Sequence, residues 1–250
     1  MTSFTISERK QVYERVLAIA KADNRVTGGA VVGSFANNNE DELSDIDLTF
    51  GIKSGIEVAQ VLQEWTESLN AVFNVIDSFD IKFATSIYRV FLFSNCLELD
   101  LSVVPEKDYG AITSNFRLLF GKANKPKISS KPDVENLIGL GWHHVLHANL
   151  AICRRKPWQA EYWISALRDH IISMKCIRLG LSSIYAKGAD NISNQEIKGM
   201  ESTFIKSLDL SELTVALIAT SGFLISEVQH YNKKLAIKLA DTFQKLFDKQ

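Results

Sequence analysis

The sequence has little of what marks several protein classes. It contains three cysteines, Cys96, Cys153 and Cys176, which are far apart, odd in number and without a C-x-x-C pair. We therefore expect free thiols in a reducing compartment and no disulfide framework. The formal net charge is −1, so no overall basic field attracts a nucleic-acid backbone. The N-terminus has no apolar signal core, and no run reaches the roughly 18 apolar residues of a membrane span. A cytoplasmic location is the expectation.

What the chain does have is the composition of an ordinary soluble protein. Hydrophobic residues make up 46% and charged residues 23% of 250 residues, which is typical of globular domains. This length allows one large domain or two medium ones.

Helix and strand patterns alternate up to about residue 121. Ser7 is placed to cap a helix that runs to about Ala22. Runs that are apolar, β-branched or aromatic predict strands, with a helix over residues 57–69 between the second and the third. The expected strands cover residues 26–34, 46–52, 71–79, 85–94 and 96–104.

The second half follows a different pattern. Residues 121–133 hold glycine, prolines, serines and lysines without apolar periodicity, which indicates a linker. Beyond it, helical patterns cover residues 133–155, 158–180 and 211–247, the last with a possible break near Gly222. We predict an α+β chain. Residues 1–121 would form a mixed sheet flanked by helices, and residues 131–250 an all-helical bundle.

The stretch VVGSFANNNEDELSDIDLTFGI carries the main chemical signal. Gly33 and Ser34 end one expected strand, and Asp45 and Asp47 begin the next. Residues two apart on a strand face the same side, so these two carboxylates project together. Like charges held this close repel one another unless a cation lies between them, and Mg²⁺ with its oxygen ligands fits that role. Gly33 lets the backbone approach a phosphate, and Ser34 offers a hydroxyl and an N–H.

A later strand adds a further acid. In CLELDLSVV the leucines lie on one face, and Glu98, Asp100 and Ser102 lie on the other. If this strand lies beside the first aspartate strand, Asp45, Asp47 and Asp100 converge at one sheet edge. Three carboxylates can hold two metal ions for an in-line phosphoryl displacement. Each feature alone is also common as a turn or a surface acid, so the prediction depends on their combination.

The order G-S, then D-x-D, then a later strand with one more Asp resembles the polymerase-beta-type nucleotidyltransferase superfamily. The likeness covers roughly residues 25–121, including LDLSVVPEKDYG. It implies that Gly33 and Ser34 hold a nucleoside triphosphate and that Asp45, Asp47 and Asp100 hold Mg²⁺. A compact first domain followed by a helical one is similar to the aminoglycoside and lincosamide nucleotidyltransferases. That resemblance implies transfer of a nucleoside monophosphate, expected to be AMP from ATP, onto a hydroxyl with release of pyrophosphate.

The helical half offers weaker candidates. Glu161, Arg168 and Lys175 are spaced by seven, so they share one helix face. This face is either a solvated surface or the wall of a cleft between the domains. In the second case Arg168 and Lys175 would bind the triphosphate, while Glu161 and Glu98 would bind the acceptor, and the acids would favour a cationic one such as an aminoglycoside.

Three histidines stand close together at His143, His144 and His147. His143 and His147 share a helix face and could chelate a metal ion. The Glu of H-E-x-x-H metalloproteases is missing. Hydrogen bonding and simple exposure remain alternatives, so the role of the three stays open.

Other functions remain open from the sequence. They are nucleotidyl transfer onto a protein, as in antitoxin-type minimal enzymes, and a non-catalytic nucleotide-binding regulatory module. The expected partners are a nucleoside triphosphate and a small hydroxyl compound, with no nucleic acid and no membrane. The acceptor, the base and the oligomeric state stay undetermined.

Overall fold

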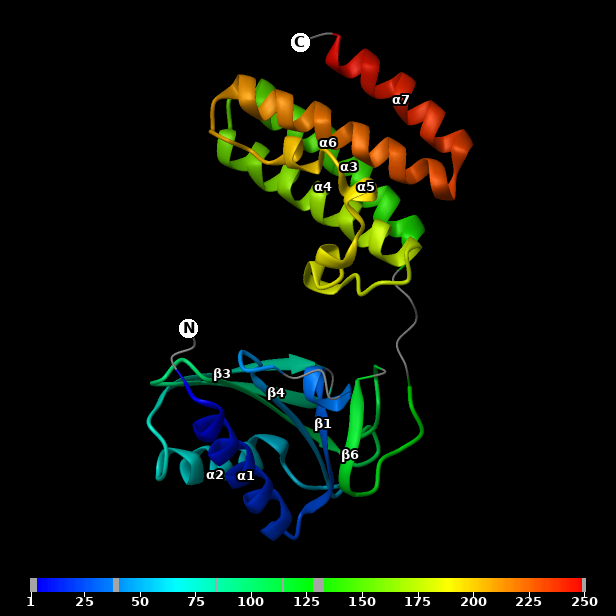
Figure 1. Cartoon of the computed structure of the whole chain (residues 1–250). Helices are drawn as coiled ribbons and strands as arrows, with labels where there is room; N and C mark the ends of the chain where they lie inside the picture. The colour runs from blue at the N-terminus through cyan, green and yellow to red at the C-terminus, as the bar shows by residue number, and fades with distance from the viewer. Residues whose placement is uncertain (1–3, 38–40, 84, 114, 128–132, 249–250) are drawn as a thin grey trace. The chain divides into compact units, whose positions relative to one another are not determined.

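A computed structural model describes residues 4–37, 41–83, 85–113, 115–127 and 133–248, apart from the side chains at positions 34, 37 and 83. The contacts divide the chain into two compact units, Met1–Ser130 and Lys131–Gln250. The first is a six-stranded mixed sheet with helices, and the second is helical (Figure 1). The α+β fold class predicted from the sequence is confirmed.

The sheet has the strand order β3-β4-β5-β2-β1-β6. Only β2 and β5 pair in parallel; the other neighbours in the described sheet are antiparallel. The strands are β1 (Val26–Val32), β2 (Ile46–Ile52), β3 (Val75–Phe83), β4 (Ser86–Phe93), β5 (Glu98–Pro105) and β6 (Phe116–Gly121). The sequence pattern missed β6 and placed β3 four residues too early.

Two helices cover one face of this sheet, α1 (Ile6–Ala22) and α2 (Val58–Asn70) (Figure 1). Thr5, and not Ser7 as the sequence suggested, caps α1, because Thr5 and Glu8 form a reciprocal capping box. The apolar face of α2 packs on Phe50, whose ring meets Trp65 edge-on at 5.2 Å. This core fixes which residues of β2 and β5 turn to the opposite face.

The end of α1 is tied to α2 by a polar network. Asp23 accepts hydrogen bonds from Arg25 (Nη2, 2.7 Å) and from the indole N–H of Trp65 (2.9 Å). Its side chain is only 10% exposed. These bonds, led by the one from Arg25, lower the pKa of Asp23 to about 2.

Because the folded-state pKa of Asp23 lies below its unfolded value, the network stabilises the fold above pH 4 and loses this effect as the pH falls towards 2. We expect Asp23→Asn to lower the free energy of unfolding by about 2 kcal/mol at neutral pH and to flatten its decline between pH 4 and 2. Urea titrations at several pH values measure this. Parallel curves for the variant and the wild type would contradict it.

The second unit is built on four longer helices, α3 (Val134–Cys153), α4 (Pro157–Arg178), α6 (Leu210–Tyr231) and α7 (Lys233–Phe247). Short turns connect α4 to α6, namely η2 (Ile184–Ala186), η3 (Ala189–Asn191), α5 (Asn194–Ile197) and η4 (Met200–Thr203). The break expected near Gly222 is wrong, because α6 runs through it and the chain turns at Asn232.

In the described residues α6 is the one helix long and apolar enough to cross a membrane by length and composition. Its Leu213, Leu217 and Leu224 are fully buried in the core of the helical unit, as in the central helix of a bundle.

Candidate functional site

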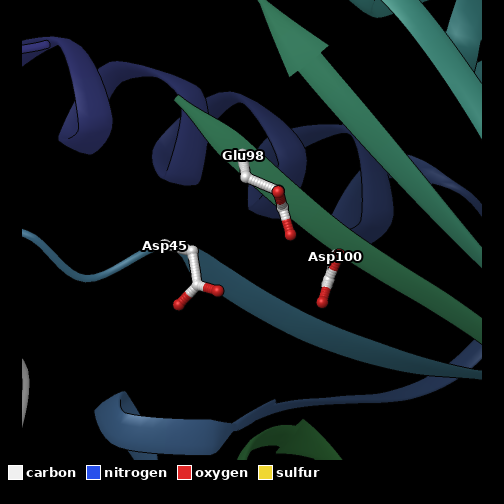
Figure 2. A group of neighbouring side chains, drawn as sticks. All are labelled: Asp45, Glu98 and Asp100. Carbon is white, nitrogen blue, oxygen red and sulfur yellow. The ribbon is translucent and has the colours of Figure 1, made fainter. Parts of the chain in front are cut away.

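Three carboxylates meet at one end of β2 and β5. Asp45 stands just before β2, and Glu98 and Asp100 lie two apart on β5, so both point to the same face. One carboxylate oxygen from each of the three lies within 4.8 Å of the others. Figure 2 shows these side chains pointing into one shared space. Asp45 and Asp100, two of the three acids expected to converge, belong to this group, and its third member is Glu98, where the sequence suggested Asp47.

The strand register explains this meeting. β2 and β5 run in parallel with Asp47 directly opposite Asp100. Ile46 and Leu99 alternate with the acids and are buried against the helices, which holds the carboxylates on the open face. The hydrophobic pattern of the two strands thus positions the acids.

Asp47 lies beside Gly33, where the chain leaves β1. Gly33 has a φ of +66°, and a Cβ at this position would overlap the Asp47 carboxylate. Only glycine meets both demands, since its backbone adopts this conformation readily and it adds no side-chain atom. Asp47 is therefore in contact with the turn that the sequence assigns to phosphate binding.

This turn continues as the 3-10 helix η1 (Gly33–Asn37), and Arg9 of α1 supports it. The Arg9 guanidinium lies 5.1 Å from the ring centre of Phe35 and donates to the carbonyl oxygens of Asp41 (2.6 Å) and Ser44 (2.8 Å). Arg9 is thereby bound to both sides of the segment that leads to Asp45. The backbone of Ser34 lies in η1, but its side chain is outside the described part of the structure.

The polar face continues from the carboxylates along both strands. Ser102 donates a hydrogen bond of 2.6 Å to the hydroxyl of Thr49, and both side chains are buried. The hydroxyl of Tyr109 donates to the carbonyl oxygen of Thr49 (3.4 Å), and burial raises the pKa of this hydroxyl. The hydroxyls of Ser102 and Thr49 form the floor of a cavity of about 670 Å³ that also reaches Gly33.

The walls of this cavity are mostly apolar. Val32, Tyr88, Val104 and Phe116 contribute this apolar surface from four strands of the sheet, and Lys107, Asp108 and Lys127 add charged groups to the lining. Its size lies within the usual range for small-molecule sites, about 300–1,000 Å³. A second hollow of about 230 Å³ is lined by Asp45 and Glu98, with Phe4, Leu43 and the exposed Cys96 around them.

The donor set fits a hard divalent cation. Carboxylate oxygens are the ligands that Mg²⁺ and Mn²⁺ prefer, and both ions keep positions open for phosphate oxygens. Carboxylates this close to one another repel, and a bound cation would remove that repulsion. Asp45, Glu98 and Asp100 would hold such an ion, with Asp47 on the adjoining strand position.

Glu161 and Arg168 of α4 take part in local contacts. Ser165 donates to Glu161 (2.7 Å) and accepts from Arg168 (3.0 Å). Arg168 also donates to the carbonyl of Thr203 (2.8 Å), and its guanidinium lies 4.7 Å from the ring centre of Phe204. These contacts join α4 to the η4 turn. Roles of Glu161 and Arg168 in substrate binding stay predictions.

The spacing of Lys175 from Glu161 and Arg168 suggested a solvated surface or the wall of a cleft, but its environment is different. It is buried and forms ion pairs with Glu227 (3.1 Å) and Glu196 (3.2 Å). Arg178 contacts the same two acids, each at 2.7 Å. This network joins α4, α5 and α6. It accounts for the charge of Lys175 within the helical unit and argues against a phosphate contact.

Several site features lay outside the sequence prediction. Glu98 was assigned to the acceptor, yet it belongs to the carboxylate group; the E-x-D pattern of residues 98–100, which repeats D-x-D, was the signal for it. Arg9 gave no signal, because its contacts span more than thirty positions in the chain.

The described geometry can be set beside known proteins. No family model and no curated protein matches the chain. Among solved structures, it is similar to an aminoglycoside 6-adenyltransferase from Bacillus subtilis, with 14% identity, a TM-score of 0.44 and coverage of 96% of this chain and 97% of that one. It is also similar to the cyclic dinucleotide synthase CdnE from Elizabethkingia meningoseptica, with 14% identity, a TM-score of 0.32 and coverage of 89% and 91%. Because these sequence identities and TM-scores are low, a function for this chain has to be inferred from the geometry of its site.

Proposed function

We propose that the protein is a metal-dependent nucleotidyltransferase that moves a nucleoside monophosphate from a nucleoside triphosphate to a hydroxyl of a small molecule. One observation carries this proposal: Asp45, Glu98 and Asp100 come from two neighbouring strands to within 4.8 Å, beside a glycine turn that contacts Asp47. A cation site next to a glycine turn of the backbone is what binding of a triphosphate requires.

The parts of the site have distinct roles in this proposal. The carboxylates would hold one or two Mg²⁺ ions, and a cation bound there would neutralise charge on the triphosphate. The N–H groups of the Gly33 turn bind phosphate oxygens, since no Cβ keeps them away. Arg9 keeps the segment before Asp45 in place through two carbonyl contacts.

The transfer step is an in-line displacement at the α-phosphorus. A new bond forms from the acceptor oxygen to this phosphorus, and the bond to the bridging oxygen breaks, so that pyrophosphate leaves with the electron pair. The hydroxyl proton passes to a carboxylate, for which we propose Asp100. Asp100 is less exposed than Glu98 and lies opposite Asp47.

The 670 Å³ cavity gives room for a small reactant next to this centre. Its hydroxyl floor and apolar walls suit a compound of mixed polarity. ATP as donor and an aminoglycoside or lincosamide as acceptor are the first compounds to test, since the expected order of a catalytic and a helical domain resembles those enzymes.

We expect pyrophosphate release only when a divalent cation, a nucleoside triphosphate and a suitable hydroxyl compound are all present. The experiment combines four nucleoside triphosphates with panels of aminoglycosides, lincosamides and neutral hydroxyl compounds, in Mg²⁺ and in excess chelator. Acceptor-dependent release in excess chelator would contradict the proposal. Nucleotide binding without release for any donor and acceptor would instead favour a regulatory module.

A further inference from the structure

Four of the chain's five histidines gather in one place in the helical unit. His143, His144 and His147 come from α3, and His170 comes from α4. The ring centre of Trp163 lies 4.9 Å from that of His144 and 5.0 Å from that of His147, and the ring of His170 stacks on that of His144 at 4.8 Å. We call these five residues the imidazole cluster. The proposed transfer reaction uses none of them.

Within the imidazole cluster, His143 and His147 form the closest pair. They are four residues apart and lie on adjacent turns, and their ring centres are 4.2 Å apart. Both side chains are half-buried, so solvent reaches them. Two imidazoles at this spacing on a helix can chelate one metal ion, since a nitrogen of each ring can turn to the same point.

The cluster also holds polar atoms that packing alone does not explain. Nδ1 of His144, Nε2 of His170 and Nε1 of Trp163 are buried and have no hydrogen-bond partner in the described structure. His144 is only 8% exposed. Buried polar groups usually have a partner in the protein, a water molecule or an ion. Three such atoms within one group of rings indicate that an ion with its water molecules binds there.

Simple aromatic packing of α3 on α4 explains the ring contacts, but leaves these three nitrogens unsatisfied. We propose that His143 and His147 bind a divalent transition-metal ion, such as Zn²⁺, Ni²⁺ or Cu²⁺. Water molecules on the ion would supply partners for the buried nitrogens around it.

The expected metal differs from that of the carboxylates. Imidazole favours Zn²⁺, Ni²⁺ and Cu²⁺, whereas carboxylate favours Mg²⁺ and Mn²⁺. Within the described residues, Asp45, Glu98 and Asp100 are the group of three or more donors that come within 4.8 Å of one another. At the histidine site the protein therefore supplies two imidazole ligands, and water molecules would occupy the remaining coordination positions of the ion.

Calorimetric titration of the full chain with Ni²⁺, in excess Mg²⁺ to saturate the carboxylates, tests this site. We expect one binding event that weakens at least tenfold in His143→Gln and in His147→Gln. His230→Gln is the matched control, because His230 is the fifth histidine, lies exposed on α6 and should leave the affinity unchanged. Circular dichroism confirms that each variant is folded.

Tryptophan fluorescence is a second measurement, and its response to Cu²⁺ is not expected if the histidines serve only in packing. Cu²⁺ on His143 and His147 should quench Trp163, which contacts both rings. Trp163→Phe should reduce this quenching, leaving the part that comes from Trp142, whose ring centre lies 6.2 Å from that of His143, and should keep Ni²⁺ binding. The proposal is overturned if Ni²⁺ fails to bind, if neither histidine variant weakens binding, or if His230→Gln weakens it equally.

Discussion

Replacing Asp45 by Asn is expected to lower the rate of nucleotidyl transfer by about 1,000-fold or more, since a metal ion supplies several kcal/mol of charge stabilisation in phosphoryl transfer. Asp100→Asn should have an equal or larger effect, because Asp100 belongs to the same carboxylate group and is also the proposed proton acceptor. Single-turnover release of pyrophosphate at saturating Mg²⁺ measures both.

The same changes should leave the fold intact or stabilise it slightly. Each removes one of several negative charges held close together, so repulsion in the metal-free protein declines. Thermal unfolding in chelator measures this. Glu57→Gln is a suitable control, because Glu57 is exposed before α2, on an element that packs on the opposite face of the sheet. Wild-type turnover in Asp45→Asn or Asp100→Asn would show that these carboxylates do not hold the catalytic ion.

Gly33→Ala is expected to abolish transfer through geometry alone. The new Cβ would overlap the Asp47 carboxylate, so Asp47 or the turn must move away from its present position. The φ of +66° adds about 1–2 kcal/mol of backbone strain for any residue with a Cβ. We expect loss of triphosphate binding as well as turnover, which equilibrium dialysis with labelled ATP and Mg²⁺ measures.

Gly55→Ala, in the same unit, separates the effect of backbone strain from that of steric overlap. Gly55 has a φ of +83°, yet a Cβ there would meet no atom within 4 Å. This variant should lose stability through backbone strain and keep full transfer. If Gly33→Ala binds ATP as tightly as Gly55→Ala does, the Gly33 turn is not the phosphate site.

The alternation of acidic and apolar residues made the carboxylate site predictable from sequence. In IDLTFGI and CLELDLSVV the apolar positions must face the core, so the acids between them share the opposite face. That β2 and β5 are neighbours was only a condition of the prediction. The alternation of apolar and polar residues indicates which side of a strand each residue faces, but it does not determine which strands lie side by side.

Other features depend on tertiary contacts that a local pattern does not contain. β6 is a partly exposed edge strand whose only strand partner in the described sheet is β1. Lys175 follows the spacing of a surface residue, but Glu196 and Glu227 supply buried counter-charges from distant segments. Gly222 was expected to break a helix, yet its helix continues, since one glycine costs only about 1 kcal/mol in a well-packed helix.

In the proposed mechanism, the carboxylates and the Gly33 turn together bind a metal–triphosphate complex. Calorimetric titration of the wild type and of Asp45→Asn with a non-hydrolysable ATP analogue tests it most directly, in Mg²⁺ and in excess chelator. We expect binding by the wild type in Mg²⁺, at least tenfold weaker binding by the variant, and none by either protein in chelator. Equal affinity of the wild type in Mg²⁺ and in chelator, or equal affinity of the two proteins in Mg²⁺, would contradict it.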